Sequence, residues 1–215
     1  SLVSGATVLQ TQARELLIVQ EQAVREGRLN ITIPAAPAAL PSWPVTFGVP
    51  FPAGALDDPD RIRLLDDAGR ELPLQARVTS RWSKNGSVRW LLADTLAAVG
   101  PAPVKLTLMY GPAARRPAAA AGLRVAEDAA QITVDTGAAR FVFPKRNTPG
   151  LGEVYLDRNH DGIYQPAELV MRADQTNGPC LVDEAGQKFL GGNDAAAAVA
   201  LESAGPVKAC VRVAG

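Results

Sequence analysis

"RVTSRWSKNGSVRWLLADT", residues Arg77–Thr95, carries the clearest fold signal in the sequence. Two runs rich in Val and Trp flank the dipeptide Asn85-Gly86. Asn-Gly can occupy both positive-φ positions of a type I′ turn, the turn that best joins two antiparallel strands. We therefore predict a β-hairpin that turns at Asn85-Gly86.

The segments on either side of this hairpin also have strand patterns. "RIRLLDDAGRELPLQARV" indicates strand, turn and strand, with Asp67-Ala68-Gly69 in the turn. "WPVTFGVPFPAGAL", Trp43–Leu56, contains prolines 44, 50 and 52, which exclude a helix and favour an edge strand followed by an irregular loop. "RLNITIP" and "PVKLTLMYG" alternate apolar and polar residues with period two, as half-buried strands do.

"GPAARRPAAAAG", Gly111–Gly122, interrupts the strand pattern and is typical of a linker. Short strand candidates follow it: "LRVAE", "QITVDTG", "ARFVFP", "EVYLD", "CLVDE", "QKFLG", "VALES" and "VKACVRV". Residues 1–28 fit one face of a helix and a strand equally well. We predict an all-β chain with four parts: an N-terminal extension 1–28, a small β-barrel domain 29–112, a linker 113–122 and a second β domain 123–215.

The composition excludes several classes of protein. The chain has 215 residues, 47% hydrophobic and 20% charged, and its 22 Lys and Arg balance 22 Asp and Glu. Because no overall positive field exists, we expect no nucleic-acid partner. No apolar run is long enough for a membrane span. The first residues lack a signal peptide, so the chain is either intracellular or a mature exported form; we expect secretion or a periplasmic location.

Cysteine and histidine are scarce. The two cysteines, Cys180 and Cys210, are too few for a Cys-rich zinc site, but they could form one disulfide or remain two free thiols. The one histidine is His160. A Ser-His-Asp or Cys-His arrangement would have to use it.

"YLDRNHDGIYQPAEL", Tyr155–Leu169, matches the ligand spacing of a calcium loop. Ca²⁺ takes six to eight oxygen ligands, and Gly162 at loop position 6 permits the sharp turn that such a loop needs. The alternative is an Asp- and Asn-rich turn without a metal. We predict one Ca²⁺ as cofactor, held by Asp157, Asn159, Asp161, the carbonyl of Ile163, Gln165 and Glu168. We also expect the Ile163 side chain to pack inward and anchor the loop.

The flanks of the loop bear on its role. "GEVYLD" before it is strand-like, and only "PAELVMRAD" after it could start a helix. Sensor EF-hands act by opening a pair of helices. The sequence therefore favours an EF-hand-like loop in a β-hairpin connection, where Ca²⁺ acts as a structural clip.

Other candidate sites are less specific. Trp43, Trp82 and Trp90 could line a sugar platform, although packing in the core or within the hairpin is the favoured interpretation. We also expect Trp82 and Trp90 to be cross-strand neighbours. No carboxylate pair stands out for glycoside hydrolysis, because the Asp and Glu pairs lie in turn-like segments.

The segment Trp43–Thr95 resembles the N-terminal domain of the exo-rhamnogalacturonan lyase-like family. The features that carry the resemblance are "PVTFGVPFP", "LLDDAGRELPLQ" and "GSVRWLL". In that family this domain is a small RIFT-related barrel, followed by a β-sandwich and an α/α toroid. "ITVDTGAARFVF" and "GPVKACVRV" are similar to the opening strands of the sandwich.

The resemblance implies a RIFT-like β-barrel followed by an incomplete, β-sandwich-like domain, and a carbohydrate context. No toroid is present, and no catalytic residue carries over, so the catalytic residues stay unknown. We expect a non-catalytic N-terminal portion of a longer, polysaccharide lyase-like protein with a polysaccharide as partner. The alternative is a structural or adhesive module, stiffened by Ca²⁺, of a secreted or cell-surface assembly.

Overall fold

The computed structural model describes residues 3–4, 7–8, 24–116, 122–173 and 179–215. These residues form strands and two short 3₁₀ turns, so the predicted all-β class is confirmed. No helix in these ranges is long and apolar enough to cross a membrane. The choice between helix and strand for residues 1–28 falls mostly on residues 9–23, outside the described residues. Among the described residues of the N-terminal extension, β1 (Val3–Ser4) pairs with β2 (Thr7–Val8).

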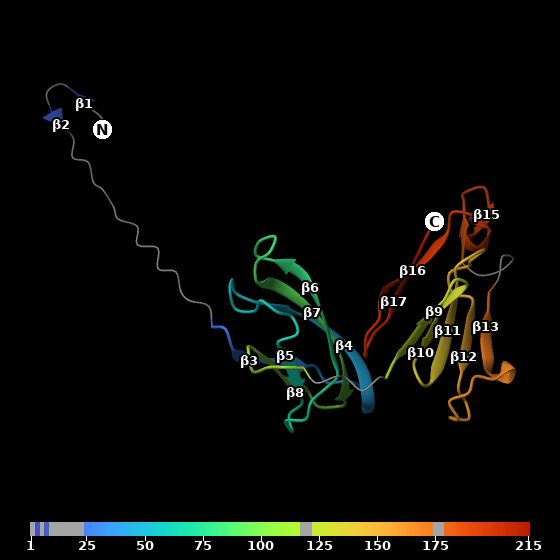
Figure 1. The fold of residues 1–215 in the computed structure, drawn as a ribbon, viewed down its shortest axis with the longest axis horizontal. Coiled ribbons are helices and arrows are strands. Elements are labelled where there is room, and N and C mark those ends of the chain that lie inside the picture. The colour runs from blue at the N-terminus through green and yellow to red at the C-terminus, as the bar shows by residue number, and fades with distance from the viewer. Residues whose placement is uncertain (1–2, 5–6, 9–23, 117–121, 174–178) are drawn as a thin grey trace.

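Residues 27–110 form two three-stranded antiparallel sheets (Figure 1). The first has the order β3 (Gly27–Ile33), β8 (Val104–Tyr110), β5 (Ile62–Leu65). The second has the order β4 (Leu40–Pro50), β7 (Val88–Val99), β6 (Leu74–Arg81). The central strands, β8 and β7, both come after their two neighbours in the sequence. Each sheet is therefore completed only when its central strand is in place.

The core of this segment follows the predicted alternation. In β3, Leu29, Ile31 and Ile33 are half-buried and pack against the core, and the residues between them are exposed. In β8, Leu106 and Leu108 are almost completely buried. Burying a Leu, Ile or Val side chain contributes about 1.5–3 kcal/mol. The buried core combines strand residues with Phe51, Ala55 and Leu56 from the loop after β4. Its members are Val49, Phe51, Ala55, Leu56, Ile62, Leu64, Leu74, Val88, Leu91, Ala93, Leu106 and Leu108.

The proline-rich strand lies at an edge, as predicted. β4 is the outer strand of its sheet and pairs only with β7. On the side of β4 that faces away from β7, the missing N–H groups of Pro44 and Pro50 therefore remove no hydrogen bond between strands. The irregular loop that follows includes Phe51, whose N–H donates to the carbonyl of Arg89 at 3.0 Å.

The predicted hairpin exists, but its predicted turn type is wrong. β6 and β7 pair antiparallel, and Trp82 N–H donates to the Ser87 carbonyl at 3.1 Å. Neither Asn85 nor Gly86 has a positive φ. The turn is instead Ser83–Gly86, closed by a 3.0 Å bond from Gly86 N–H to the Ser83 carbonyl. Four-residue hairpin loops are usually built around such a turn, with Gly favoured at its last position.

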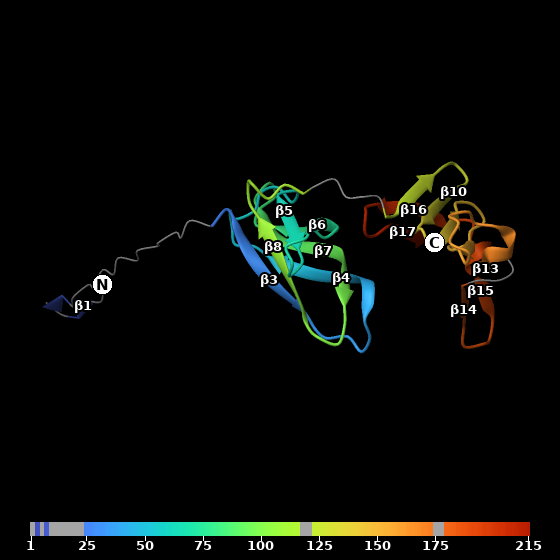
Figure 2. The same cartoon turned by 90° about the horizontal axis from the view of Figure 1, so that it is seen from below.

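Residues 124–172 form a five-stranded antiparallel sheet, a meander in chain order whose strands are labelled in Figure 1; Figure 2 shows its strands β10 and β13 from below. Its strands are β9 (Arg124–Glu127), β10 (Gln131–Asp135), β11 (Ala139–Pro144), β12 (Glu153–Leu156) and β13 (Leu169–Arg172). The sequence allowed a helix to start after Gln165, but none does. Only one 3₁₀ turn, η1 (Pro166–Glu168), forms there. The chain then becomes extended because Leu169 and Met171 pair with β12.

Two hairpins complete the described chain: β14 (Cys180–Val182) with β15 (Lys188–Leu190), and β16 (Ala198–Ser203) with β17 (Cys210–Ala214). Cys180 and Cys210 lie in different hairpins, and both thiols are free. The Cys210 thiol donates to Glu202 Oε2 at 3.3 Å, which raises its pKa. Of the two alternatives for the cysteines, the structure has the unpaired thiols.

Residues just before β17 touch the outer face of the β4–β7–β6 sheet. The side-chain oxygen of Gln75 accepts hydrogen bonds from the N–H groups of Val207 and Lys208, at 3.3 and 2.9 Å. The Lys208 ammonium lies 3.4 Å from Asp94 Oδ1, which also accepts from the Thr46 hydroxyl. These contacts neutralise Asp94, a carboxylate that is only 8% exposed.

Candidate functional site

The candidate calcium loop connects two paired strands. Asp157 follows the last residue of β12, and Glu168 precedes the first residue of β13. Because Tyr155 pairs with Leu169, both ends of the loop lie at the base of one hairpin. The prediction of a loop within a β-hairpin connection therefore agrees with the observed elements.

Backbone N–H groups turn toward the acidic side chains of the loop. Asp157 accepts from Asp161 N–H at 3.2 Å and from Gly162 N–H at 2.9 Å. Asp161 accepts from Ile163 N–H at 2.7 Å. The chain can curl this tightly because His160 and Gly162 have φ values of 58° and 74°. Gly162 thus fills the conformational role expected of loop position 6.

Glu168 closes the loop through its own hydrogen bonds. Its Oε1 accepts from Arg158 N–H at 3.0 Å, and its Oε2 accepts from Gln165 N–H at 3.1 Å. The η1 turn makes this possible, because it folds Glu168 back over the start of the turn in a capping box. The last candidate ligand is therefore tied to the second and ninth positions of the loop.

Asp157 and Glu168 are buried carboxylates without a cationic partner. They are 5% and 6% exposed, and within the described ranges neither forms an ion pair with Lys, Arg or His. Burying an unpaired charge is costly. Each carboxylate oxygen has two lone-pair directions, so the N–H bonds leave acceptor capacity for a cation.

The remaining candidate ligands are more exposed and bond among themselves. Asn159 and Gln165 donate side-chain N–H bonds to Asp161 Oδ2, at 2.9 and 3.4 Å. Within the described residues, no three His, Cys, Asp or Glu side chains are arranged to hold a metal ion together. The structure thus brings the six predicted residues into one loop, and it places only the carboxylates of Asp157 and Glu168 in its buried part.

The side chain that anchors the loop is Tyr164, not Ile163 as expected. Ile163 is 63% exposed, so its side chain does not pack inward. The Tyr164 hydroxyl donates to Asp135 Oδ1 at 2.7 Å, and the Arg140 guanidinium lies 4.2 Å from its ring centroid. Sequence reasoning missed Tyr164 because its partners come from β10 and β11, far along the chain.

The environment of Tyr164 changes two pKa values. Burial raises the pKa of Tyr164 to about 12, and the hydrogen bond to Asp135 acts in the same direction. Burial also opposes ionisation of Asp135. Hydrogen bonds from Gly137 N–H, Tyr164 and Arg140 outweigh it, so the pKa of Asp135 falls below its ordinary value. Tyr164 is therefore a neutral donor at neutral pH and not a base.

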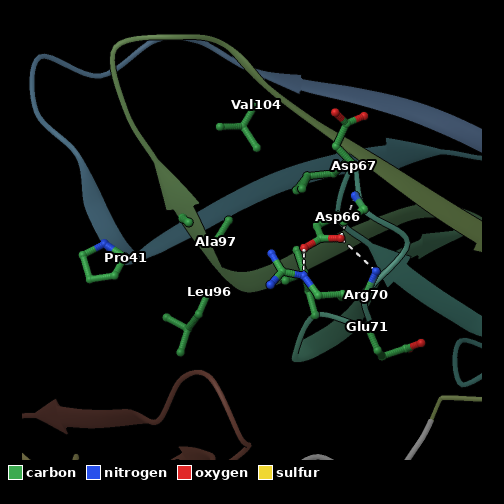
Figure 3. A pocket seen from close by; sticks show the side chains of 12 residues that line it. Pro41, Asp66, Asp67, Arg70, Glu71, Leu96, Ala97 and Val104 are labelled. Carbon is green, nitrogen blue, oxygen red and sulfur yellow. Dashed lines mark hydrogen bonds and ion pairs between the residues drawn. The ribbon is translucent and has the colours of Figure 1, made fainter.

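A groove of about 610 Å³ lies at the barrel end near the Asp66–Arg70 turn (Figure 3). Aliphatic side chains such as Leu72, Leu96 and Val104 line it beside this turn. Asp66 accepts from Ala68 N–H, from Arg70 N–H and from Arg70 Nε at 2.7–3.0 Å, and the bond from Arg70 N–H is the main cause of its lowered pKa. The groove offers an apolar floor with a satisfied ion pair, and its lining residues include no His, Cys or Ser.

The three tryptophans lie on the surface of the barrel segment and not in its core. Trp43, Trp82 and Trp90 are 49%, 48% and 44% exposed. We expected Trp82 and Trp90 to be cross-strand neighbours. Trp90 instead pairs with Ser80, so the two tryptophans do not lie directly opposite each other. Trp82 donates from Nε1 to the Phe51 carbonyl at 2.9 Å, and Arg89 lies 4.9 Å from its ring centroid.

Comparison with known proteins identifies the barrel segment. The sequence model of a family described as "PcRGLX-like N-terminal RIFT barrel domain" matches residues 33–108. These residues run from the last residue of β3 into β8, so the match covers β4, β5, β6 and β7 completely and most of β8. A search of curated proteins found no match to the chain. The resemblance to the exo-rhamnogalacturonan lyase-like family is thereby confirmed, and residues 33–108 belong to the family of PcRGLX-like N-terminal RIFT barrel domains.

Proposed function

We propose that this chain is a non-catalytic portion of a carbohydrate-active, polysaccharide lyase-like protein and that it binds one structural Ca²⁺. The family of the RIFT barrel supports the carbohydrate context. In this proposal the barrel domain spans 29–112, a linker spans 113–122 and a β-sandwich-like domain spans 123–215. The protein acts outside the cell or in the periplasm, where free Ca²⁺ is plentiful enough for modest affinity.

The observation that carries the calcium proposal is the pair of buried carboxylates at the two ends of one hairpin loop. Asp157 and Glu168 need a positive partner, and the described chain supplies none. An oxygen-rich, acidic donor set fits Ca²⁺ better than it fits softer metals. The ion would be held by Asp157, Asn159, Asp161, the Ile163 carbonyl, Gln165 and Glu168.

A structural role suits this loop better than a sensor role. β12 and β13 already pair at its base, and one 3₁₀ turn is the only helical element within the loop. A sensor requires two helices that change their angle. Ca²⁺ would instead neutralise the buried carboxylates and fix the β12–β13 connection.

A lyase needs a base beside the uronate and a cation that neutralises the developing charge. His160 lies inside the loop, with Asp157 and Asp161 as its near neighbours in sequence. Tyr164 holds its proton because its pKa is raised to about 12. On these grounds we assign polysaccharide cleavage to a different part of the complete protein.

Two measurements test this proposal. Calorimetric titration of the chain with Ca²⁺ should give one site, and titration with Mg²⁺ should give much weaker binding, because Mg²⁺ demands a smaller octahedral site. Incubation with rhamnogalacturonan and Ca²⁺ should give no rise in ultraviolet absorbance from unsaturated products. Absence of a Ca²⁺ site, or turnover that disappears on mutation of a residue of this chain, would contradict the corresponding half of the proposal.

A further inference from the structure

A second pocket, of about 370 Å³ and with a polar lining, lies where the Asp57–Arg61 loop meets the end of the barrel segment. Asp58, Asp60, Arg61, Arg115 and Arg116 line it. It lies beyond the end of β8 and before the start of β5.

Arg116 is the fixed part of this pocket. Its side chain is only 19% exposed. Nη1 donates to the Leu74 carbonyl at 3.1 Å, and Nη2 donates to the Pro59 carbonyl and to Asp60 Oδ1, at 2.8 and 3.0 Å. Its Nε is buried and has no hydrogen-bond partner. A buried N–H without an acceptor is costly, so an acceptor at this position would be favourable.

The two carboxylates of the pocket are already engaged. Asp58 accepts from Asp60 N–H at 2.9 Å and lies 3.6 Å from Arg61 Nε. Asp60 is paired with Arg116, as described above. Arg61 also donates from Nη1 to the Pro112 carbonyl at 2.6 Å. Both acids therefore have a guanidinium partner before any ligand arrives.

Arg115 is the one arginine of the pocket that takes part in none of these ion pairs. It is exposed, and within the described ranges its guanidinium forms no ion pair or hydrogen bond. Three guanidinium groups thus face two carboxylates, which gives the pocket one excess positive charge and several free N–H donors. Such a group of donors matches the planar or tetrahedral oxygens of an anion.

We propose that this pocket binds an oxyanion, with Arg115 as the recruiting cation and Arg116 as the rigid donor. A carboxylate and a phosphate share the chemistry that a guanidinium recognises. The natural source is therefore either the carboxylate of an acidic sugar or a free inorganic anion. The site is separate from the calcium loop, so neither proposal depends on the other.

The two sources can be distinguished by titrating the chain with two probes. The first is inorganic phosphate at constant ionic strength, and the second is a short oligogalacturonate, with a neutral oligogalactan of equal length as its control. The NMR signal of the Arg116 Nε–H group reports on the pocket directly. We expect it to shift with at least one of the two anionic probes and to stay unchanged with the neutral one.

Arg115→Gln is the informative variant, because within the described residues the Arg115 side chain forms no hydrogen bond or ion pair. Loss of one charge-assisted interaction should weaken binding of the active probe about tenfold. Arg70→Gln is the matched control: Arg70 is an exposed arginine in the turn after β5, whereas Asp58, Asp60 and Arg61 of the pocket precede β5, so its loss should leave the affinity unchanged.

Each outcome decides the proposal. A shift with the oligogalacturonate alone supports the site and identifies an acidic sugar, and a shift with phosphate alone supports the site and identifies a free anion. Shifts with both support the shared oxyanion chemistry. The proposal is overturned if neither anion moves the Arg116 signal, or if Arg115→Gln binds as tightly as the parent.

Discussion

Tyr164 and Asp135 are joined by a 2.7 Å hydrogen bond from phenol to carboxylate, which ties the middle of the 157–168 loop to the end of β10. Arg140 completes the contact by covering the Tyr164 ring and pairing with Asp135 at 3.3 Å. The loop is thus anchored in two places: at its base by β12 and β13, and at its middle by Tyr164. The conformation of the 157–168 loop therefore depends on contacts with β10 and β11 as well as on the β12–β13 pairing.

Removing the Tyr164 hydroxyl should destabilise the chain. Tyr164→Phe keeps the ring under Arg140 but removes the bond to Asp135, at an expected cost of about 1–3 kcal/mol for a hydrogen bond to a charged group. Urea denaturation measures this loss as a lower midpoint with an unchanged slope. Tyr155→Phe serves as control, since it removes a comparable phenol–carboxylate bond, to Glu153, that does not involve the loop. A parental midpoint for Tyr164→Phe would show that the anchor has no energetic role.

Calcium should raise the melting temperature of the chain. A ligand that binds only the folded state stabilises it by about 2.7 kcal/mol when its concentration is a hundred times Kd. Glu168→Gln keeps the size of the side chain but removes its charge, so it should abolish most of this increase. Glu184→Gln, an exposed acid outside the loop, should respond to Ca²⁺ as the parent does. An equal calcium effect in both variants would refute the assignment of the ligands.

Stability of the barrel should depend on pH through Asp66. The N–H groups of Arg70 and Ala68 and the Arg70 side chain hold the folded-state pKa of Asp66 below its ordinary value. The unfolded chain then binds this proton more readily than the folded chain. The contribution to stability is present above the ordinary Asp pKa and is lost as pH falls through the lowered folded value.

Asp66→Asn tests this expectation through the melting temperature measured between neutral and acidic pH. The parent should be the more stable protein at pH 7, and the difference should vanish in acid. A difference that is independent of pH would mean that the Asp66 charge does not contribute.

Two glycines with positive φ should respond differently to alanine. Gly69 has φ 76° and open space around it, so Gly69→Ala should cost only the backbone penalty, about 1–2 kcal/mol. Gly111 has φ 126°, and an added Cβ would lie 2.8 Å from Glu26 Cα and 2.9 Å from the Arg25 carbonyl oxygen. Gly111→Ala should therefore cost clearly more. Thermal unfolding of both variants compares them, and a smaller loss at Gly111 would argue against this close approach.

A core substitution should show which residues hold the barrel together. Leu108 is fully buried in β8, between β3 and β5. Leu108→Ala should lower the free energy of unfolding by about 2–5 kcal/mol. Val170→Ala, at a site that is 42% exposed, should cost far less. Similar losses at the two positions would contradict the assignment of Leu108 to the core.

The sequence by itself determined the strands and most of the barrel. Alternation in "RLNITIP" and "PVKLTLMYG" depends only on the period of an extended chain, so Leu29 and Leu108 could be assigned to the core directly. The prolines of β4 likewise determine an edge position through a missing N–H donor. The loop spacing of Asp157 and Glu168 was readable because all six candidate ligands lie within twelve consecutive residues.

Tertiary structure alone decided the features that depend on partners distant in sequence. The residues after Gln165 form β13 and not a helix, because pairing with β12 outweighs a weak local preference. Tyr164 meets Asp135, and Arg116 meets Asp60, across 29 and 56 positions of the chain. A hydrogen bond or an ion pair needs both groups within a few ångströms, and no local sequence period encodes that proximity. The strands could therefore be read from the sequence, whereas the loop anchor and the arginine pocket became visible only in the fold.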